Sequence, residues 1–307
     1  MIERIGVLGA GTMGRGLARL FATNGLHTVV YDPDQNALAA AQKLRIPKEA
    51  HQDHAGAADP GDKFLKYTTV LKEAVSEADF IIESAPEDLE IKRKLFSEIA
   101  SIMKPGAIVA SNTSTFPLAK LSDQQPFADR LIITHFFNPA HIIPLVEIVQ
   151  TESTSSGVAV EIENLLRRCG KVPVILKKDI QGFIANRLQA AVLREACFLL
   201  EKGIADARQI DTVMKESIGM RWALSGPFQV ADYGGLDIWE KVLRNLLPVL
   251  DNKTEVPLII SEKVKRNELG LKTGKGFFNY DVSSSQEHAS DWTTKLMRLL
   301  KARMKGT

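Results

Sequence analysis

A glycine-rich turn, Gly9-Ala10-Gly11-Thr12-Met13-Gly14, constrains the fold of this chain more than any other segment. It follows a short apolar run, residues 5–8, and opens a helical pattern that continues to residue 22. A second apolar run, residues 28–31, ends in Asp32. The order strand, glycine turn, helix, strand and acid is the fingerprint of a dinucleotide-binding βαβ unit.

Each residue of this turn has a physical task in such a unit. Gly9 permits the tight turn off the strand, Gly11 lets the backbone approach a pyrophosphate, and Gly14 lets the helix pack close to the strand. Thr12 and Met13 lie at the N-terminus of the helix, where unpaired N–H groups and a partial positive charge favour phosphate. The alternative is a glycine-rich turn that holds no ligand.

The acid after the second strand selects among dinucleotides. Asp32 is placed to accept hydrogen bonds from the adenosine ribose hydroxyls, and its charge repels a 2′-phosphate. The next residues, Pro33 and Asp34, include no arginine that would hold such a phosphate. The sequence therefore predicts NAD as the cofactor rather than NADP.

Composition narrows the class of protein. The chain has 307 residues and a net charge of +2, which gives no strong field for nucleic acid or for a membrane surface. No apolar run reaches the ~18 residues that cross a bilayer, and the N-terminus leads directly into a predicted core strand. We expect a cytoplasmic protein. His51, Asp53 and His54 lie in a polar loop without cysteine, so no metal site is expected.

Strands and helices alternate through the first part of the chain, and the pattern changes near Asp179. From Gly182 onward the sequence reads as helices, with Gly203 and Gly219 as expected stops and no clear strand. The predicted fold is α/β: a doubly wound, mostly parallel sheet of the Rossmann type in residues 1–180, followed by a smaller all-helical domain in residues 181–307. The expected strands are residues 5–8, 28–31, 79–83, 107–110, 131–134, 145–149 and 172–176.

One histidine stands out as a candidate base for hydride-transfer chemistry. His135 ends a predicted strand, and the carboxyl ends of strands are where open α/β sheets bind ligands. Glu147 interrupts an otherwise apolar strand, and a buried carboxylate needs a partner. An imidazole is a suitable one, because the acid fixes its tautomer and stabilises the imidazolium. A purely structural histidine is the alternative.

Eight segments together resemble the 3-hydroxyacyl-CoA dehydrogenase family, which includes the bacterial 3-hydroxybutyryl-CoA dehydrogenases. The resemblance covers nearly the whole chain. Its segments are residues 9–18, 83–92, Ser111-Asn112-Thr113-Ser114, His135-Phe136-Phe137-Asn138-Pro139, Leu145-Val146-Glu147, residues 182–187, Gly226-Pro227 and residues 272–277.

The resemblance implies a role for several residues in catalysis. His135 would be the general base that takes the proton of the 3-hydroxyl group, and Glu147 would orient and polarise it. Ser114 and Asn186 would hydrogen-bond the reacting oxygen. Without the resemblance, Ser114 could be a turn residue, and Asn186 a capping or structural amide.

The resemblance also extends the NAD site. Glu87, Lys92, Asn112 and Ser114 match positions near the nicotinamide half of the cofactor. Asn138 lies in a matching motif, and Lys272 lies in the C-terminal motif and would also reach the cofactor. Lys92 alternatively belongs to a solvated helix face.

Two departures from the family leave the substrate open. The stretch from residue 43 to residue 66 is short and broken, where the acyl-CoA enzymes have a long basic helical excursion. Arg221 and Trp222 replace the usual His-Pro-Met before Gly226-Pro227, which resembles relatives that act on free hydroxy acids. Arg221 would bind a substrate carboxylate, or else pair with Asp232 or Asp237.

Three functions remain from the sequence. The leading one is NAD-dependent oxidation of a short-chain L-3-hydroxyacyl-CoA, such as 3-hydroxybutyryl-CoA in fatty acid metabolism. The second is the same chemistry on a free 3-hydroxy acid of the L-carnitine or L-gulonate type, and the third is a non-catalytic NAD-binding protein. Apolar helix faces at residues 190–193 and 198–200 exceed what one interdomain contact would bury, and we expect a homodimer through the helical domain.

Overall fold

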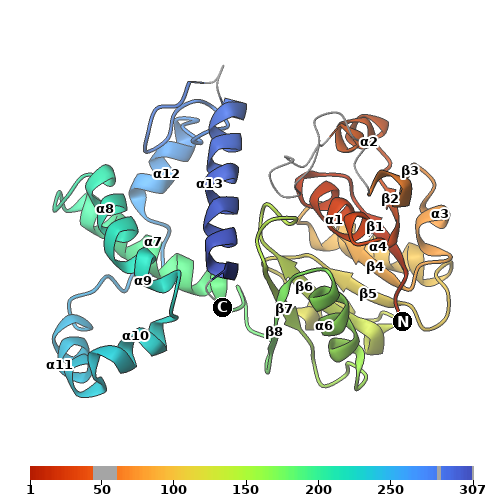
Figure 1. Ribbon diagram of the computed structural model, residues 1–307, viewed down its shortest axis with the longest axis horizontal. Helices are drawn as coiled ribbons and strands as arrows, with labels where there is room; N and C mark the ends of the chain where they lie inside the picture. Colours follow the sequence, from red (N-terminus) through yellow and green to blue (C-terminus); the bar gives the residue numbers. More distant parts are fainter. Residues whose placement is uncertain (44–60, 282–284, 306–307) are drawn as a thin grey trace. The chain divides into compact units, whose positions relative to one another are not determined.

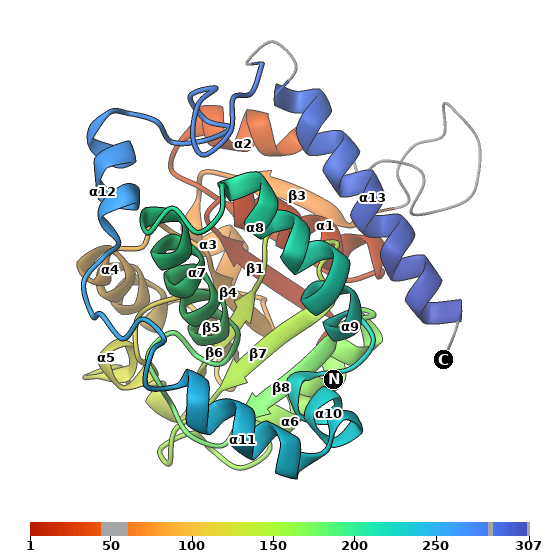
Figure 2. The ribbon, with the colours of Figure 1, turned by 90° about the vertical axis from the view of Figure 1, so that its left-hand side faces the viewer.

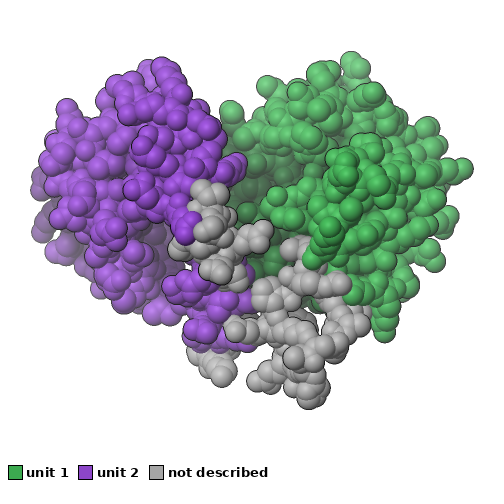
Figure 3. Space-filling view, turned by 90° about the horizontal axis from the view of Figure 1, so that it is seen from above, with its two compact units in different colours: residues 1–186 green, residues 187–307 purple. Residues whose placement is uncertain are grey.

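A computed structural model describes residues 1–43, 61–281 and 285–305, with the backbone alone for 285–290 and 304–305. It divides into two compact units, residues 1–186 and 187–307, which are coloured separately in Figure 3. The sequence-based boundary of 180/181 therefore falls six residues before this division. His51, Asp53 and His54 lie outside the described residues.

Unit 1 is built on an eight-stranded sheet of order β3-β2-β1-β4-β5-β6-β7-β8 (Figure 1). Neighbouring strands are parallel except β6 and β7, which are antiparallel. The first six strands have the doubly wound order of a dinucleotide-binding domain, and the predicted fold class is confirmed. The strands are β1 Arg4–Leu8, β2 His27–Tyr31, β3 Leu65–Thr68, β4 Phe80–Glu83, β5 Ile108–Ser111, β6 Leu131–Phe136, β7 Leu145–Val149 and β8 Val172–Leu176.

Helices cover both faces of the sheet because its strands are apolar on both sides. Side chains of α1, α2 and α6 form one core with one set of strand residues. Side chains of α3, α4 and α5 form a second core with the alternate strand residues. These helices are α1 Thr12–Thr23, α2 Gln35–Gln42, α3 Leu71–Val75, α4 Leu89–Ala100, α5 Leu118–Ser122 and α6 Val158–Arg168.

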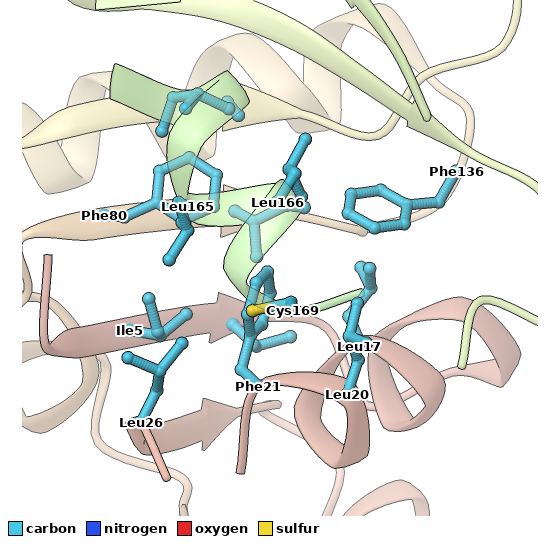
Figure 4. Packing of buried hydrophobic residues seen from close by; sticks show 14 of the residues in the cluster. Ile5, Leu17, Leu20, Phe21, Leu26, Phe80, Phe136, Leu165, Leu166 and Cys169 are labelled. Atoms are coloured by element: carbon cyan, nitrogen blue, oxygen red, sulfur yellow. The ribbon is translucent and has the colours of Figure 1, made fainter. Parts of the chain in front are cut away.

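An aromatic cluster ties the first core to the strand that carries the candidate base. Phe21 of α1 is fully buried and makes edge-to-face contacts with Phe80 of β4 and Phe136 of β6 (Figure 4). Their ring centroids lie 6.1 and 6.5 Å away, within the range of favourable aromatic pairs. The glycine turn and the end of β6 are therefore anchored to the same core.

The described part of unit 2 is helical, as predicted, and contains only isolated β-bridges near residues 270–279 (Figure 2). None of the described helices is long and apolar enough to cross a membrane. The helices are α7 Ala185–Glu201, whose first two residues belong to unit 1, α8 Ala207–Val213, a π-helix Met214–Gly219, α9 Met220–Trp222, α10 Pro227–Gly234, α11 Leu236–Leu246, α12 Leu258–Lys265 and α13 Ser285–Lys305.

Four local features differ from the sequence-based expectation. Strand β3 was not predicted, because it is a short edge strand with partly exposed side chains. Helix α13 was also not predicted. Gly203, with φ +66°, follows the end of α7 as expected, but Gly219 does not end a helix: it closes the π-helix, and α9 follows directly. His135 lies inside β6, one residue before its end.

Candidate active site

The glycine turn after β1 has the geometry of a phosphate cradle. A side chain on Gly14 would place its Cβ 1.8 Å from the carbonyl oxygen of Gly9, and Gly9 itself has φ +106°. Both glycines are therefore required by the turn itself. A Cβ on Gly11 would meet nothing within 4 Å, so the missing side chain there leaves open space in front of the turn. This is the space that a bound pyrophosphate needs.

The surroundings of the turn fit NAD. Asp32 follows β2, and its Oδ2 accepts the N–H of Ala10 at 2.8 Å, which aligns the acid with the turn. Each carboxylate oxygen retains acceptor capacity for a ribose hydroxyl. Helix α1 has no side-chain cap at Gly11, so the first N–H groups, at exposed Thr12 and partly buried Met13, are available to an anion.

The candidate base and its acid face each other across the one antiparallel strand pair. His135 of β6 and Glu147 of β7 are directly opposite in the register, so their side chains project from the same face. His135 Nδ1 lies 2.8 Å from Glu147 Oε2, and both residues are buried. This contact puts the proton on Nδ1 and leaves the lone pair on Nε2, which makes no hydrogen bond to the described residues.

The other oxygen of Glu147 is bound at the start of α7. Oε1 accepts the N–H groups of Ile184 at 2.9 Å and Ala185 at 3.0 Å. Burial alone would raise the pKa of Glu147, but the hydrogen bonds from His135 and from these amides hold it below its ordinary value. The carboxylate therefore stays ionised and can stabilise an imidazolium beside it.

Two phenylalanines surround the imidazole of His135. The ring of Phe137 is centred 4.4 Å away and that of Phe183 5.2 Å away. These apolar neighbours lower the local dielectric and strengthen the interaction between His135 and Glu147.

A second buried network lies at the ends of β4 and β5. Glu83 ends β4 and is fully buried; its Oε1 accepts Lys92 Nζ at 2.7 Å. Lys92 also pairs with Glu87 at 3.2 Å. Lys92 is 1% exposed, so its interpretation as part of a solvated face is wrong.

Glu87 organises the loop that carries Ser114. Its Oε1 accepts the Ser114 N–H at 3.1 Å and the Thr113 hydroxyl at 2.6 Å, as well as the N–H and hydroxyl of Thr115. Burial would raise the pKa of Glu87, but the two threonine hydroxyls and the charge of Lys92 lower it. The Ser114 side chain makes no hydrogen bond to the described residues and is partly exposed.

Asn112 joins this network to the strand of His135. Its Oδ1 accepts the N–H of Phe136 at 2.9 Å, so the end of β5 fixes the end of β6. Asn138 is exposed in the turn that follows. Asn186 lies in the first turn of α7, directly after the amides that bind Glu147, and its side chain makes no hydrogen bond within the described chain.

The remaining two candidates belong to unit 2. Lys272 is exposed in a turn before the isolated bridges. Arg221 lines a pocket of about 350 Å³ together with Ser225 and Tyr233. Among the described residues, its guanidinium donates only to the Ser217 carbonyl, at 3.4 Å.

The alternative ion pairs of Arg221 with Asp232 or Asp237 are absent, although all three side chains are among those described.

Sequence reasoning missed Glu83. The signal was present, since Glu83 ends the apolar run Phe80-Ile81-Ile82 just as Glu147 interrupts the apolar residues of β7. A carboxylate in a buried strand requires donors, and the donors of Glu83 come from β5 and α4. The acid itself was readable from the sequence, but these partners were not.

Comparison with known proteins assigns the chain to a family. The NAD-binding domain of 3-hydroxyacyl-CoA dehydrogenase matches residues 4–180, and the C-terminal domain of the same enzyme matches residues 182–280. The chain belongs to the 3-hydroxyacyl-CoA dehydrogenase family. It is thus an NAD-dependent oxidoreductase, which confirms the predicted cofactor and enzyme class.

Relatives in this family act on different substrates. The chain is 35% identical to the 5-formyl-3-hydroxy-2-methylpyridine 4-carboxylate 5-dehydrogenase of Mesorhizobium japonicum, over 99% of this chain and 100% of the relative. It is 32% identical to the human mitochondrial hydroxyacyl-coenzyme A dehydrogenase, over 91% of this chain and 92% of the relative.

Solved structures show the same two kinds of enzyme. A crystal structure of a 5-formyl-3-hydroxy-2-methylpyridine 4-carboxylic acid 5-dehydrogenase superposes with a TM-score of 0.89 at 33% identity, covering 99% of each chain. The (S)-3-hydroxybutyryl-CoA dehydrogenase PaaH1 from Ralstonia eutropha has a TM-score of 0.70 at 31% identity, covering 92% of this chain and all of that one.

The glycine turn gives a paired prediction. Gly11→Ala keeps the fold, because its Cβ meets nothing, but it weakens NAD binding at least about tenfold. Gly14→Ala lowers the free energy of unfolding by about 2–3 kcal/mol, because its Cβ meets backbone. Urea unfolding and calorimetric NAD titration measure the two effects. Equal loss of stability in both variants would contradict this division of roles.

The His135–Glu147 pair gives a second prediction. Glu147→Gln lowers kcat by about 10²- to 10⁴-fold, since the imidazole loses its orienting acid, and NAD affinity stays within about twofold. The pKa of Glu147 in the folded protein lies below its ordinary value of 4.5. The contribution of Glu147 to the free energy of unfolding is therefore present above pH 4.5 and is lost as the pH falls through the pKa of the folded protein. The variant therefore has a shallower loss of stability in acid, measured by urea unfolding across pH. A parallel loss of NAD affinity would assign the pair a structural role.

Proposed function

We propose that this protein oxidises the hydroxyl group of a small hydroxy acid to a carbonyl. His135 is the general base, and Glu147 orients it. NAD supplies the hydride acceptor when bound. His135 Nε2 takes the hydroxyl proton, and the resulting imidazolium is stabilised by Glu147. In the opposite direction His135 returns the proton as the carbonyl is reduced. The 2.8 Å contact between Nδ1 and Oε2 supports this assignment.

Ser114 and Asn186 are proposed to hold the reacting oxygen. The hydroxyl of Ser114 and the amide of Asn186 have no hydrogen-bond partner among the described residues, so both can serve a ligand. Glu87 fixes the backbone of Ser114, and the position of Asn186 is fixed by the adjacent amides on Glu147. A hydroxyl and an amide can polarise a carbonyl and stabilise the developing alkoxide.

The substrate class is inferred from the surroundings of Arg221. It is a guanidinium without a carboxylate partner among the described residues, and it lines a pocket with the Ser225 hydroxyl. A guanidinium binds a carboxylate through two parallel hydrogen bonds. The relative with the TM-score of 0.89 is named for a pyridine carboxylate, which supports a free acid as the substrate.

An L-3-hydroxyacyl-CoA of short chain remains the second candidate. It is supported by the family and by its human relative. A CoA phosphate would need basic residues, and Lys66, in the broken stretch of residues 43–66, pairs with Glu73 at 2.7 Å. Arg45 and Lys48 lie outside the described residues.

A substrate panel tests this proposal. Acetoacetate, dehydrocarnitine and acetoacetyl-CoA are compared by NADH absorbance, and we expect turnover of at least one free acid. Arg221→Met then raises KM for that acid about 10- to 100-fold, as expected for a lost charged hydrogen bond. Arg244→Met is the matched control, because Arg244 already pairs with Glu240. Turnover of the thioester alone, or a change of KM below about twofold, would refute the carboxylate role.

We also propose that the protein is a cytoplasmic homodimer formed through unit 2. Among the described side chains of this unit, only Cys197 and Met297 are buried apolar residues. Helix α10 exposes Phe228 by 87%, and helix α11 exposes Leu236 by 63%. A pocket of about 420 Å³ between α7 and α8, lined mostly by apolar side chains, is a second unfilled surface. Such surface is unfavourable in a free monomer, and a second copy would cover it.

Light scattering tests the dimer. The expected mass is twice the 33.8 kDa of the chain. Phe228→Asp shifts the protein toward the monomer, because a charge would be buried in the interface. The control Val160→Asp changes a 53% exposed residue of unit 1 and leaves the mass unchanged. A monomeric wild-type protein would refute the proposal.

A further inference from the structure

Three charged residues form a closed cluster at the ends of β4 and α4. Glu83 is fully buried, Lys92 is 1% exposed, and the Glu87 side chain is 36% exposed. Lys92 Nζ lies 2.7 Å from Glu83 and 3.2 Å from Glu87. Two carboxylates thus share a single ammonium group.

Both carboxylate oxygens of Glu83 accept hydrogen bonds in this cluster. Its Oε1 accepts Lys92 Nζ and the N–H of Ala85, both at 2.7 Å. Its Oε2 accepts the Ser111 hydroxyl, whose oxygen also accepts the Thr113 N–H. Donors on both oxygens are the arrangement that favours a carboxylate anion.

The cluster therefore carries a net charge of −1. Glu87 is also held in its ionised form by four donors from residues 113–115. Because Glu83 and Lys92 are shielded from water, salt screens their charges far less than those of surface groups.

The sheet order places this cluster on the nicotinamide side of the cofactor site. Strands β1 and β2 provide the turn and Asp32, which take the pyrophosphate and the adenosine ribose. The neighbouring strands β4 and β5 form the second mononucleotide half (Figure 1). Glu83 is opposite Leu8 of β1 on one side and Ser111 of β5 on the other.

We infer that the Glu83–Lys92–Glu87 cluster discriminates between the two oxidation states of the cofactor through its net charge. The oxidised nicotinamide ring carries a positive charge and the reduced ring is neutral. A net negative cluster therefore favours NAD⁺ over NADH. For a unit charge at roughly 10 Å in an effective dielectric of about 20, Coulomb's law gives a factor of about fifteen in the binding constant. Glu83 is then a positioning residue that acts through its charge. Lys92 reduces the net charge of the cluster from −2 to −1.

The inference rests on NAD binding and not on the identity of the substrate, so it is tested without one. Glu83→Gln neutralises the cluster while keeping its shape. Calorimetry with NAD⁺ and with NADH is expected to show NAD⁺ binding weakened about five- to thirtyfold and NADH binding changed less than about twofold. The double variant Glu83→Gln/Lys92→Met restores a charge of −1, through Glu87 alone, and is expected to restore the preference for NAD⁺.

The matched control is Asp79→Asn, because Asp79 precedes the same strand and pairs with Lys104 at the opposite edge of the sheet. It should weaken neither cofactor selectively. If Glu83→Gln does not fold, Glu87→Gln neutralises the cluster from its more exposed member and should show the same selective loss. Equal weakening of NAD⁺ and NADH, no change in either, or a double variant that stays unselective would each overturn the inference.

Discussion

The site depends on the hydrogen bonds that Glu147 makes through its two carboxylate oxygens, which together act as a clamp. One carboxylate oxygen binds His135 and the other binds two amides at the start of α7. A single buried acid therefore fixes the imidazole, the chain entering α7 and the residue beside those amides, Asn186. The clamp works because β6 and β7 run antiparallel, which sets His135 and Glu147 opposite each other.

The same principle recurs at the ends of β4 and β5. A second buried strand glutamate, Glu83, gathers Lys92 and Ser111, and Lys92 in turn holds Glu87, which fixes the Ser114 loop. Both networks use a fully satisfied buried carboxylate rather than packing alone. Such networks fix side-chain positions closely, because any displacement leaves an unpaired charge in a low-dielectric interior.

The glycine turn and the His135–Glu147 pair were predictable from the sequence for different reasons. The turn is a local motif, and its spacing alone specifies strand, turn and helix. His135 and Glu147 were suggested by polar residues in apolar strands, and the strand register then supplied their contact. Strand β3 and the continuation of the helix through Gly219 were not readable, because an edge strand buries little and a π-helix has no simple periodicity.

The fold class and the cofactor were predictable from the amino-acid sequence, because glycine spacing and apolar periodicity are local properties. Only the tertiary structure decided which charges meet. It buried Lys92 between two acids, paired Glu147 with the start of α7 and gave Arg221 no acidic partner among the described residues. These partners lie on different strands and helices. They come into contact only after the strands have paired and their ends lie along the same edge of the sheet.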